Sequence, residues 1–239
     1  RMEEPEKIVE ILDRFFETSK PLSGKKVLIT AGPTYEKIDP VRFIGNYSSG
    51  KMGFALAEAC AEAGAEVMLV AGPVSLKTNH SSIDRIDVES AEEMYRAVLS
   101  EYDRSDIAIM CAAVADYAPE TVSDVKLKRT GEDRILRLRP NPDIAAELGR
   151  RKRPGQCLVG FALETNDEEM NARLKMEKKN LDFIVLNSLR DAGAGFQCDT
   201  NKVTVIGKQG EPMEIPCKPK IEVAADIVDI IGRYVSEDR

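Results

Sequence analysis

Short, uniformly apolar runs alternate with helical patterns along most of this chain. The runs at 26–31 and 107–115 are apolar at nearly every position, as in strands buried on both faces. The strands predicted in this way are 26–31, 66–70, 85–88, 107–115, 157–163 and 182–187. The helices predicted between and after them are 53–63, 92–102, 144–150 and 167–180. We therefore expect an α/β fold, a doubly wound, Rossmann-like, mostly parallel sheet with helices on both faces.

The pattern changes after residue 121. Residues 126–128 and 134–139 alternate polar and apolar side chains around 130–133, a pattern that predicts a β-hairpin strap with one covered face. The charged side chains on its two strands are almost all basic. A second hairpin is predicted from 203–206 and 212–215. An amphipathic helix over 221–234 closes the chain.

The first 24 residues do not share the alternation of strands and helices seen in the rest of the chain. Residues 6–18 predict a short amphipathic helix, which the Pro and Gly of 21–24 end. We interpret 1–24 as a linker helix from a preceding domain and 25–239 as one domain. The chain begins with Arg1 rather than Met, which we interpret as a fragment of a longer polypeptide or a chain with a cloning scar.

Composition narrows the function classes. A length of 239 residues, 43% of them hydrophobic, suffices for one sizeable core. The net charge of −7 disfavours a general nucleic-acid coat but allows a local cationic pocket. The five cysteines form no CxxC pair, which disfavours zinc and a disulfide framework. No apolar run is long enough to span a membrane, and no signal peptide is present, so we expect a cytoplasmic protein.

The loop 46–53, with sequence NYSSGKMG, is the most informative stretch. A turn rich in Ser and Gly that opens a helix after a strand directs backbone N–H groups and the positive helix end at one anion. Asn46 adds a neutral side-chain donor beside it. In a doubly wound fold this loop, 32–34, 39–42, 112–117 and 161–166 all follow strands, so we expect them to meet at one cleft.

Each of these residues also has an ordinary structural interpretation. Asn46 fits a turn residue and Asp116 a helix cap. Lys126 and Lys128 fit a solvated strand face. Lys175, Lys178 and Lys179 lie near a helix C-terminus, where cations are favourable. The functional interpretation depends on their coexistence near one sheet edge, which suits nucleoside triphosphate chemistry.

Two nucleotide-binding motifs fit poorly. Gly50 and Gly53 supply only half of GxGxxG, and the loop before them is too long for a tight strand-to-helix turn. The strand that ends at 70–73 has no acidic residue for a ribose diol. An NAD(P)-binding oxidoreductase remains the alternative. A Walker A sequence is absent, which excludes the P-loop class.

Taken in order, the motifs resemble the phosphopantothenoylcysteine synthetase family, the ligase half of the bifunctional bacterial coenzyme A enzymes. The stretches that carry this resemblance are 29–34, 39–44, 46–53, 111–117, 126–128, 141–144, 159–165 and 175–180. It would make 25–239 a phosphopantothenate–cysteine ligase domain, preceded in the parent protein by a decarboxylase domain to which FMN would belong.

The resemblance implies a reaction and its partners. The family activates the carboxylate of 4′-phosphopantothenate with CTP and Mg²⁺, giving an acyl-cytidylate and pyrophosphate. L-Cysteine then displaces CMP to form the amide. Members of eukaryotic type use ATP; the residues at 142–144, with Lys175 and Lys179, look bacterial and favour CTP. The family is a homodimer, with no nucleic acid or membrane among its partners.

The resemblance also assigns roles. Asn46 and Lys126 would be catalytic, Lys126 at the α-phosphate and Asn46 at the acyl oxyanion. The implied nucleotide-binding residues are Met110, Cys111, Ala112, Asp116, Lys126, Pro142, Asp143, Ile144, Ala145, Phe161, Lys175 and Lys179. The implied substrate-binding residues are Asn46, Ala112, Ala113, Asp116 and Arg42, with Arg42 reaching the neighbouring subunit's substrate phosphate. Asp116 is the candidate metal ligand. A non-catalytic subunit that keeps the fold is a third hypothesis, disfavoured by the presence of Asn46, Lys126 and Asp116.

Overall fold

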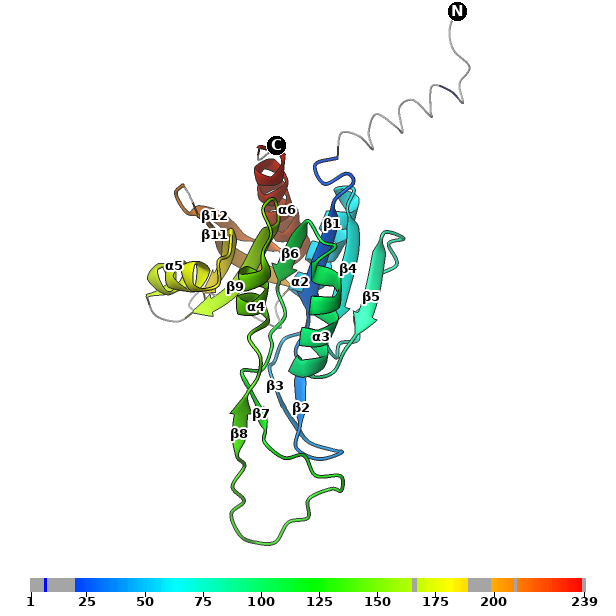
Figure 1. Cartoon of the computed structure of the whole chain (residues 1–239), viewed down its shortest axis with the longest axis vertical. Coiled ribbons are helices and arrows are strands. Elements are labelled where there is room, and N and C mark those ends of the chain that lie inside the picture. Colours follow the sequence, from blue (N-terminus) through cyan, green and yellow to red (C-terminus); the bar gives the residue numbers. More distant parts are fainter. Residues whose placement is uncertain (1–6, 8–19, 165–166, 189–198, 209, 238–239) are drawn as a thin grey trace, which may run out of the picture.

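Strand β1 lies within an eight-stranded sheet of order β12-β11-β10-β9-β6-β1-β4-β5 (Figure 1). The computed structural model describes residue 7 and residues 20–164, 167–188, 199–208 and 210–237. The strands are β1 (Lys26–Ala31), β4 (Glu66–Ala71), β5 (Ile83–Asp87), β6 (Ile107–Met110), β9 (Cys157–Glu164), β10 (Phe183–Ser188), β11 (Thr200–Gly207) and β12 (Met213–Pro219). All pairings from β10 to β5 are parallel, whereas β11 and β12 are antiparallel.

The strand order confirms the predicted class. Numbered along the chain, the six parallel strands are arranged third, second, first, fourth, fifth and sixth. This is the doubly wound order of dinucleotide-binding folds, and its direction reverses between β1 and β6. Ligands of such sheets bind beyond the carboxyl ends of the strands at that switch point.

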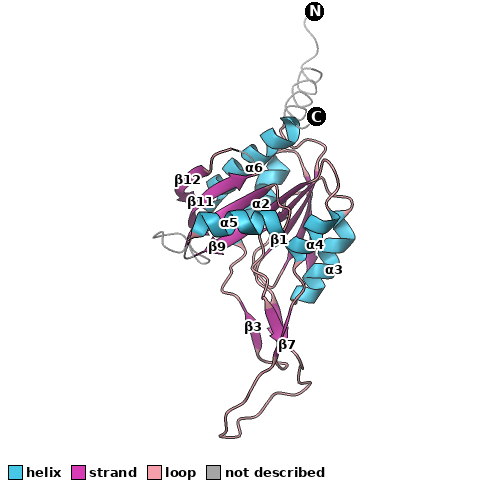
Figure 2. Ribbon diagram, turned by 60° about the vertical axis from the view of Figure 1, so that its left-hand side comes forward, coloured by secondary structure: helices cyan, strands magenta, loops and turns pink. Residues whose placement is uncertain are grey.

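Helices cover both faces of the sheet (Figure 2). They are α2 (Lys51–Glu62), α3 (Ala91–Tyr102), α4 (Ile144–Arg151), α5 (Glu168–Lys178) and α6 (Lys220–Glu237). Alternate side chains of β1 separate the two cores: Val27 and Ile29 pack with α2 and α6, whereas Leu28 packs with α3, α4 and α5. Burial on both faces explains why these strands read as uniformly apolar.

Most predicted elements are confirmed with small shifts at their ends. Helix α2 begins two residues before its predicted start, and β11 and β12 extend beyond the predicted second hairpin. Strand β6 ends at Met110, so 111–115 follow it as a connection rather than as more strand. The predicted helix 6–18 lies outside the described residues, apart from residue 7.

The predicted hairpin of 126–128 and 134–139 is wrong as to which residues pair. The strands that pair are β7 (Tyr117–Pro119) and β8 (Leu138–Pro140), and 120–137, which we call the strap, extends from them as a loop (Figure 1). Nearly every strap residue is exposed, and Ile135 is 90% exposed. Alternation stabilises a strand only when a surface covers its apolar face, and none does here within the described chain.

A second short pair was not predicted. Strands β2 (Tyr35–Lys37) and β3 (Phe43–Gly45) form an antiparallel hairpin in which Tyr35 and Phe43 stack at 3.8 Å between ring centroids. β2 contacts β7, so the two pairs together support the strap. Within the described residues, no helix combines the length and apolar character needed to cross a bilayer.

Candidate functional site

A cavity of about 580 Å³ opens at the carboxyl ends of β1, β6 and β9. Its walls come from the 46–53 loop, the connection after β6, the start of α4, the end of β9 and the end of α5. The position agrees with the switch point of the sheet. The described strand-following segments expected to converge therefore do so, except for the part around residues 39–42, while residues 165–166 of the predicted set lie outside the described residues.

The 46–53 loop forms an open helix N-terminus in the cavity wall. Gly50 is the N-cap of α2 with φ of 78°, a left-handed conformation that favours glycine, and no side chain caps the helix there. Ser48, Lys51 and Gly53 line the cavity around it. The first turn of α2 thus provides the geometry that binds anions at helix N-termini.

The side-chain amide of Asn46 joins this loop to the connection after β6. Its Nδ2 donates to the carbonyl oxygen of Ala113 at 2.9 Å. The same connection is held from β1 and from the segment that follows it, because the hydroxyls of Thr30 and Thr34 accept from the N–H groups of Ala112 (3.2 Å) and Ala115 (3.0 Å). Asn46, Ala112 and Ala113 therefore share one wall, as expected, and the amide is already oriented before any ligand binds.

Asp116 lies in the cavity wall with its side chain exposed. Its backbone carbonyl accepts from the N–H of Asn141 at 2.8 Å, and the Asn141 side chain donates to Ala115 at 2.8 Å. Among the described residues no three His, Cys, Asp or Glu side chains gather as in a closed metal site. A single carboxylate fits the way Mg²⁺ is usually held, by one or two carboxylates together with substrate phosphates.

Asp143 and Lys179 connect the nucleotide-side helices. Asp143 caps α4 by accepting from the Ala146 N–H at 3.0 Å, and Lys179 Nζ lies 2.8–2.9 Å from its carboxylate oxygens. Burial acts to raise the pKa of Asp143, but the hydrogen bonds from Lys179 and Ala146 hold this pKa below its usual range. Lys175 Nζ lies 3.5 Å from the Phe161 carbonyl.

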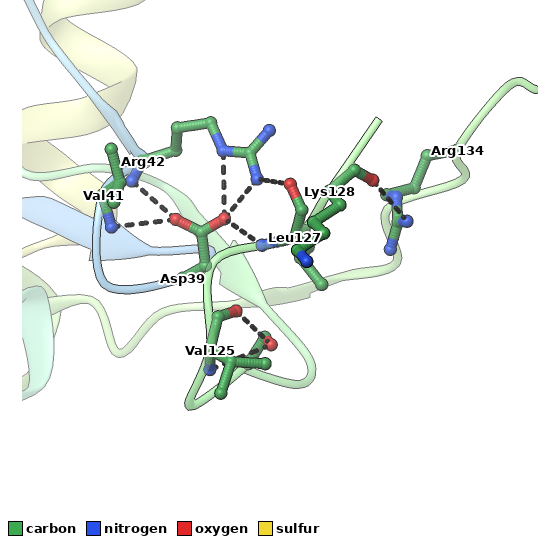
Figure 3. Close-up of polar contacts among 8 residues, drawn as sticks. Asp39, Val41, Arg42, Val125, Leu127, Lys128 and Arg134 are labelled. Carbon is green, nitrogen blue, oxygen red and sulfur yellow. Dashed lines mark hydrogen bonds and ion pairs between the residues drawn. The ribbon is translucent and has the colours of Figure 1, made fainter. Parts of the chain in front are cut away.

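Arg42 and Lys126 do not line the cavity of this chain. Arg42 belongs to a junction with Asp39 and Leu127 at the base of the strap, shown in Figure 3, and Lys126 directly precedes Leu127 in the sequence. The Asp39 carboxylate accepts from Val41 N (2.8 Å), Arg42 N (2.9 Å), Arg42 Nε (3.0 Å) and Leu127 N (3.1 Å). An Arg42 Nη nitrogen also bonds Asp39 and donates to the Leu127 carbonyl at 2.7 Å. Lys126 is thus placed by its neighbour Leu127 rather than by the cavity.

All other residues expected at the site line the cavity together, and their individual roles stay predictions. They are Asn46, Met110, Cys111, Ala112, Ala113, Asp116, Pro142, Asp143, Ile144, Ala145, Phe161, Lys175 and Lys179. Sequence reasoning missed Asn187, Asn201 and Lys220, which line the cavity from β10, β11 and α6. Asn201 lies in β11, which begins three residues before its predicted start, and Lys220 is the first residue of α6, which begins one residue before its predicted start.

The sequence matches the family described as DNA/pantothenate metabolism flavoprotein C-terminal domain over residues 22–234. The chain belongs to this family. A curated relative named "Cysteine/Cysteine sulfinic acid decarboxylase", from an unknown prokaryotic organism, is 55% identical over 95% of this chain and 65% of its own length. The "Coenzyme A biosynthesis bifunctional protein CoaBC" of Bacillus subtilis (strain 168) is 52% identical over 97% of this chain and 57% of its own length.

A solved structure agrees with this family assignment. The crystal structure of the C-terminal domain of a coenzyme A biosynthesis bifunctional protein CoaBC superposes with a TM-score of 0.78 at 42% identity, covering 92% of this chain and 100% of that one. The whole of that solved domain can therefore be compared with this chain. The chain spans only 57–65% of the two curated relatives above, so activities named for them describe longer proteins.

Proposed function

We propose that this domain is a phosphopantothenate–cysteine ligase that uses CTP. The observation that carries the proposal is the cavity at the switch point, because it gathers every expected nucleotide and substrate residue except Arg42 and Lys126. Membership of the pantothenate-metabolism family and the similarity to CoaBC proteins support it.

The chemistry of the two steps fits the cavity. In the first step a carboxylate oxygen of 4′-phosphopantothenate attacks the α-phosphorus of CTP and pyrophosphate leaves. The open N-terminus of α2, Lys175 and Lys179 are the groups that offset phosphate charge. Mg²⁺, with Asp116 as the proposed protein ligand, would neutralise the leaving pyrophosphate.

In the second step the amine of L-cysteine attacks the acyl carbon. The carbon–oxygen bond to the cytidylate breaks, CMP leaves, and the nitrogen loses a proton. Negative charge develops on the acyl oxygen during this attack. A neutral side-chain amide can stabilise this charge by donating a hydrogen bond without transferring a proton. We assign this role to Asn46, whose Nδ2 group is held at the wall that carries Ala112 and Ala113.

We further propose that the functional unit is a homodimer in the cytoplasm. The strap and its support expose large apolar side chains, with Val41 59%, Phe43 48%, Val125 69% and Ile135 90% exposed. Such a patch is typical of a protein–protein interface. A second copy placed there would bring a strap and Arg42 toward a neighbouring cavity, which would give Lys126 and Arg42 the roles that they lack within one chain.

The alternatives are less well supported. An NAD(P)-dependent oxidoreductase needs an acidic residue at the end of β4, where residues 71–73 are Ala, Gly and Pro. A decarboxylase, as one relative is named, would draw on the part of that longer protein that this chain does not span. A non-catalytic subunit would not need the expected residues that the cavity gathers.

Withholding cysteine tests the proposal directly. Incubation with CTP, Mg²⁺ and 4′-phosphopantothenate is expected to release pyrophosphate and to leave a cytidylylated intermediate that mass spectrometry detects. Adding cysteine should then release CMP. A thermal-shift panel is the control: CTP with Mg²⁺ should raise the melting temperature and NADPH should not. Absence of the intermediate and of pyrophosphate release would contradict the proposed ligase.

A further inference from the structure

One wall of the cavity is polar and takes no part in the roles assigned above. It is formed by Asn187 at the carboxyl end of β10, Asn201 at the start of β11 and Lys220 at the start of α6. Because β11 and β12 run antiparallel to their neighbours, the start of β11 and the end of β12 lie at the same sheet edge as the end of β10. We call these three residues the amide–lysine wall.

Asn201 is built into this wall and still has an unsatisfied acceptor. It is 3% exposed, lines the cavity, and its Oδ1 is buried without a hydrogen-bond partner. Its Nδ2 contacts the Met52 sulfur at 3.9 Å. The register of β11 on β12 shifts between Asn201 and Val203, a bulge of the kind that turns side chains toward functional sites. A buried acceptor left unpaired costs free energy until a ligand supplies a donor.

Asn187 repeats the same feature. Its Oδ1 is also buried without a hydrogen-bond partner, and the residue lines the same cavity. Tyr102 Oη is the remaining atom of this kind among the described residues, and it belongs to a residue that does not line the cavity. Two amide oxygens therefore require hydrogen-bond donors from whatever occupies this end of the cavity. Ionised phosphate oxygens cannot provide them, whereas an amino group can.

Positive charge lies beside these acceptors. Lys220 is buried, at 6% exposed, and lines the cavity. Its backbone N–H donates to the Asp199 carbonyl at 2.9 Å, and the Asp199 carboxylate pairs with Lys51 Nζ at 2.5 Å at the start of α2. Asp199 thus ties the starts of β11, α6 and α2 together. Lys220 therefore supplies a buried ammonium group to this wall, and an ammonium group suits a ligand carboxylate.

We propose that the amide–lysine wall is the subsite for the amino-acid substrate. The amide oxygens of Asn187 and Asn201 accept from its α-amino group, and Lys220 holds its α-carboxylate. This inference rests on the proposed ligase function, in which an amino acid is the second substrate. It assigns to the wall both the orientation of the attacking amine and the selection of an α-amino acid over a simple amine.

Comparing cysteine with cysteamine, which has the amine and thiol but no carboxylate, tests the subsite. Lys220→Met is expected to lower kcat/KM for cysteine at least about tenfold, the equivalent of one charged hydrogen bond, and to leave cysteamine within about threefold. Asn201→Ala should lower kcat/KM for both cysteine and cysteamine, because both substrates present the amine. Lys218→Met, on β12 and outside the cavity lining, is the matched control and should change neither.

Measuring pyrophosphate release without cysteine separates a failure of the proposed ligase function from a failure of the proposed amino-acid subsite. If the wild type releases no pyrophosphate, the proposed ligase function fails. If it does, but Lys220→Met raises the KM for CTP or lowers cysteine and cysteamine equally, the amino-acid subsite is overturned. Thermal melts check folding, and if Asn201→Ala does not fold, Asn187→Ala provides the same comparison from β10. Unchanged cysteine kinetics in folded variants would also contradict the subsite.

Discussion

The carboxylate of Asp39 binds the guanidinium of Arg42 and, through its Oδ2, the backbone N–H of Leu127, which lies 88 residues further along the chain. One buried side chain therefore anchors the strap to the β2–β3 hairpin. Arg42 reinforces the contact by donating to the Leu127 carbonyl. The position of Lys126 follows from this junction, so changes at Asp39 should act on the strap before they act on the cavity.

Removing the Asp39 carboxylate should release the strap. In Asp39→Ala the Leu127 N–H and the Arg42 guanidinium lose their shared acceptor. The strap should therefore detach from the β2–β3 hairpin for a larger fraction of the time. Limited trypsin digestion should cleave at the basic residues of 126–134 at least about fivefold faster than in the wild type. Asp124→Ala, an exposed strap residue, is the control; equal digestion rates for the two variants would contradict the anchoring role.

Lowering the pH should also release the strap from its junction with Asp39. The hydrogen bonds from Arg42 hold the pKa of Asp39 well below its usual range, against the opposing effect of burial. A carboxyl whose folded pKa is lowered stabilises the junction above the ordinary pKa near 3.9, and this contribution is lost as the pH falls through the folded value. NMR titration should show the Leu127 amide signal unchanged from pH 7 to 5 and shifting only well below the ordinary carboxyl pKa near 3.9. Asp39→Ala should remove that transition.

Asn46→Asp should separate the two half-reactions. The carboxylate keeps the size of the amide but repels the developing oxyanion, so amide formation should slow by about 100–1000-fold. Pyrophosphate release with cysteine withheld should continue, because the cationic groups of the cavity remain. Rapid-quench measurement of both products checks this, and wild-type rates of amide formation would remove Asn46 from its assigned role.

Lys179→Met should weaken CTP binding, whereas Lys178→Met should not. Lys179 lines the cavity and pairs with Asp143, the cap of α4, while its neighbour Lys178 is exposed outside the cavity. Loss of a hydrogen bond to a charged group corresponds to about tenfold or more in affinity. Isothermal titration with CTP and Mg²⁺ measures the difference, and equal affinities for the two variants would contradict the nucleotide role of Lys179.

Gly149→Ala should destabilise the fold at the back of the nucleotide wall. A Cβ at this position would lie 1.9 Å from the Lys179 carbonyl oxygen, so α4 and the end of α5 would have to separate. Overpacking of this kind costs about 1–3 kcal/mol or more in the free energy of unfolding. Arg151→Ala, on the exposed side of α4, should stay within about 0.5 kcal/mol. Urea titration compares the two variants.

The sequence predicted the sheet well because its strands are buried on both faces, and burial leaves an unambiguous apolar pattern in β1, β4, β9 and β10. The predicted pairing of 126–128 with 134–139 was wrong because alternating polar and apolar residues do not show whether another part of the protein covers the apolar face. Asn201 and Lys220 were missed for a different reason. Their significance comes from the antiparallel turn of β11 and β12 back to the ligand edge, which no local pattern encodes.

The antiparallel pair β11–β12 also has an evolutionary consequence. The parallel strands from β5 to β10 complete the doubly wound order by themselves, and the appended segment begins with β11 and β12, which extend the sheet at the β10 edge, and ends with α6, which packs with α2. Substitutions in that appended segment can alter the amide–lysine wall while the strands that carry the proposed nucleotide residues stay intact. Such a division would allow descendants of one ancestral scaffold to exchange acceptor amines while retaining the same activating nucleotide.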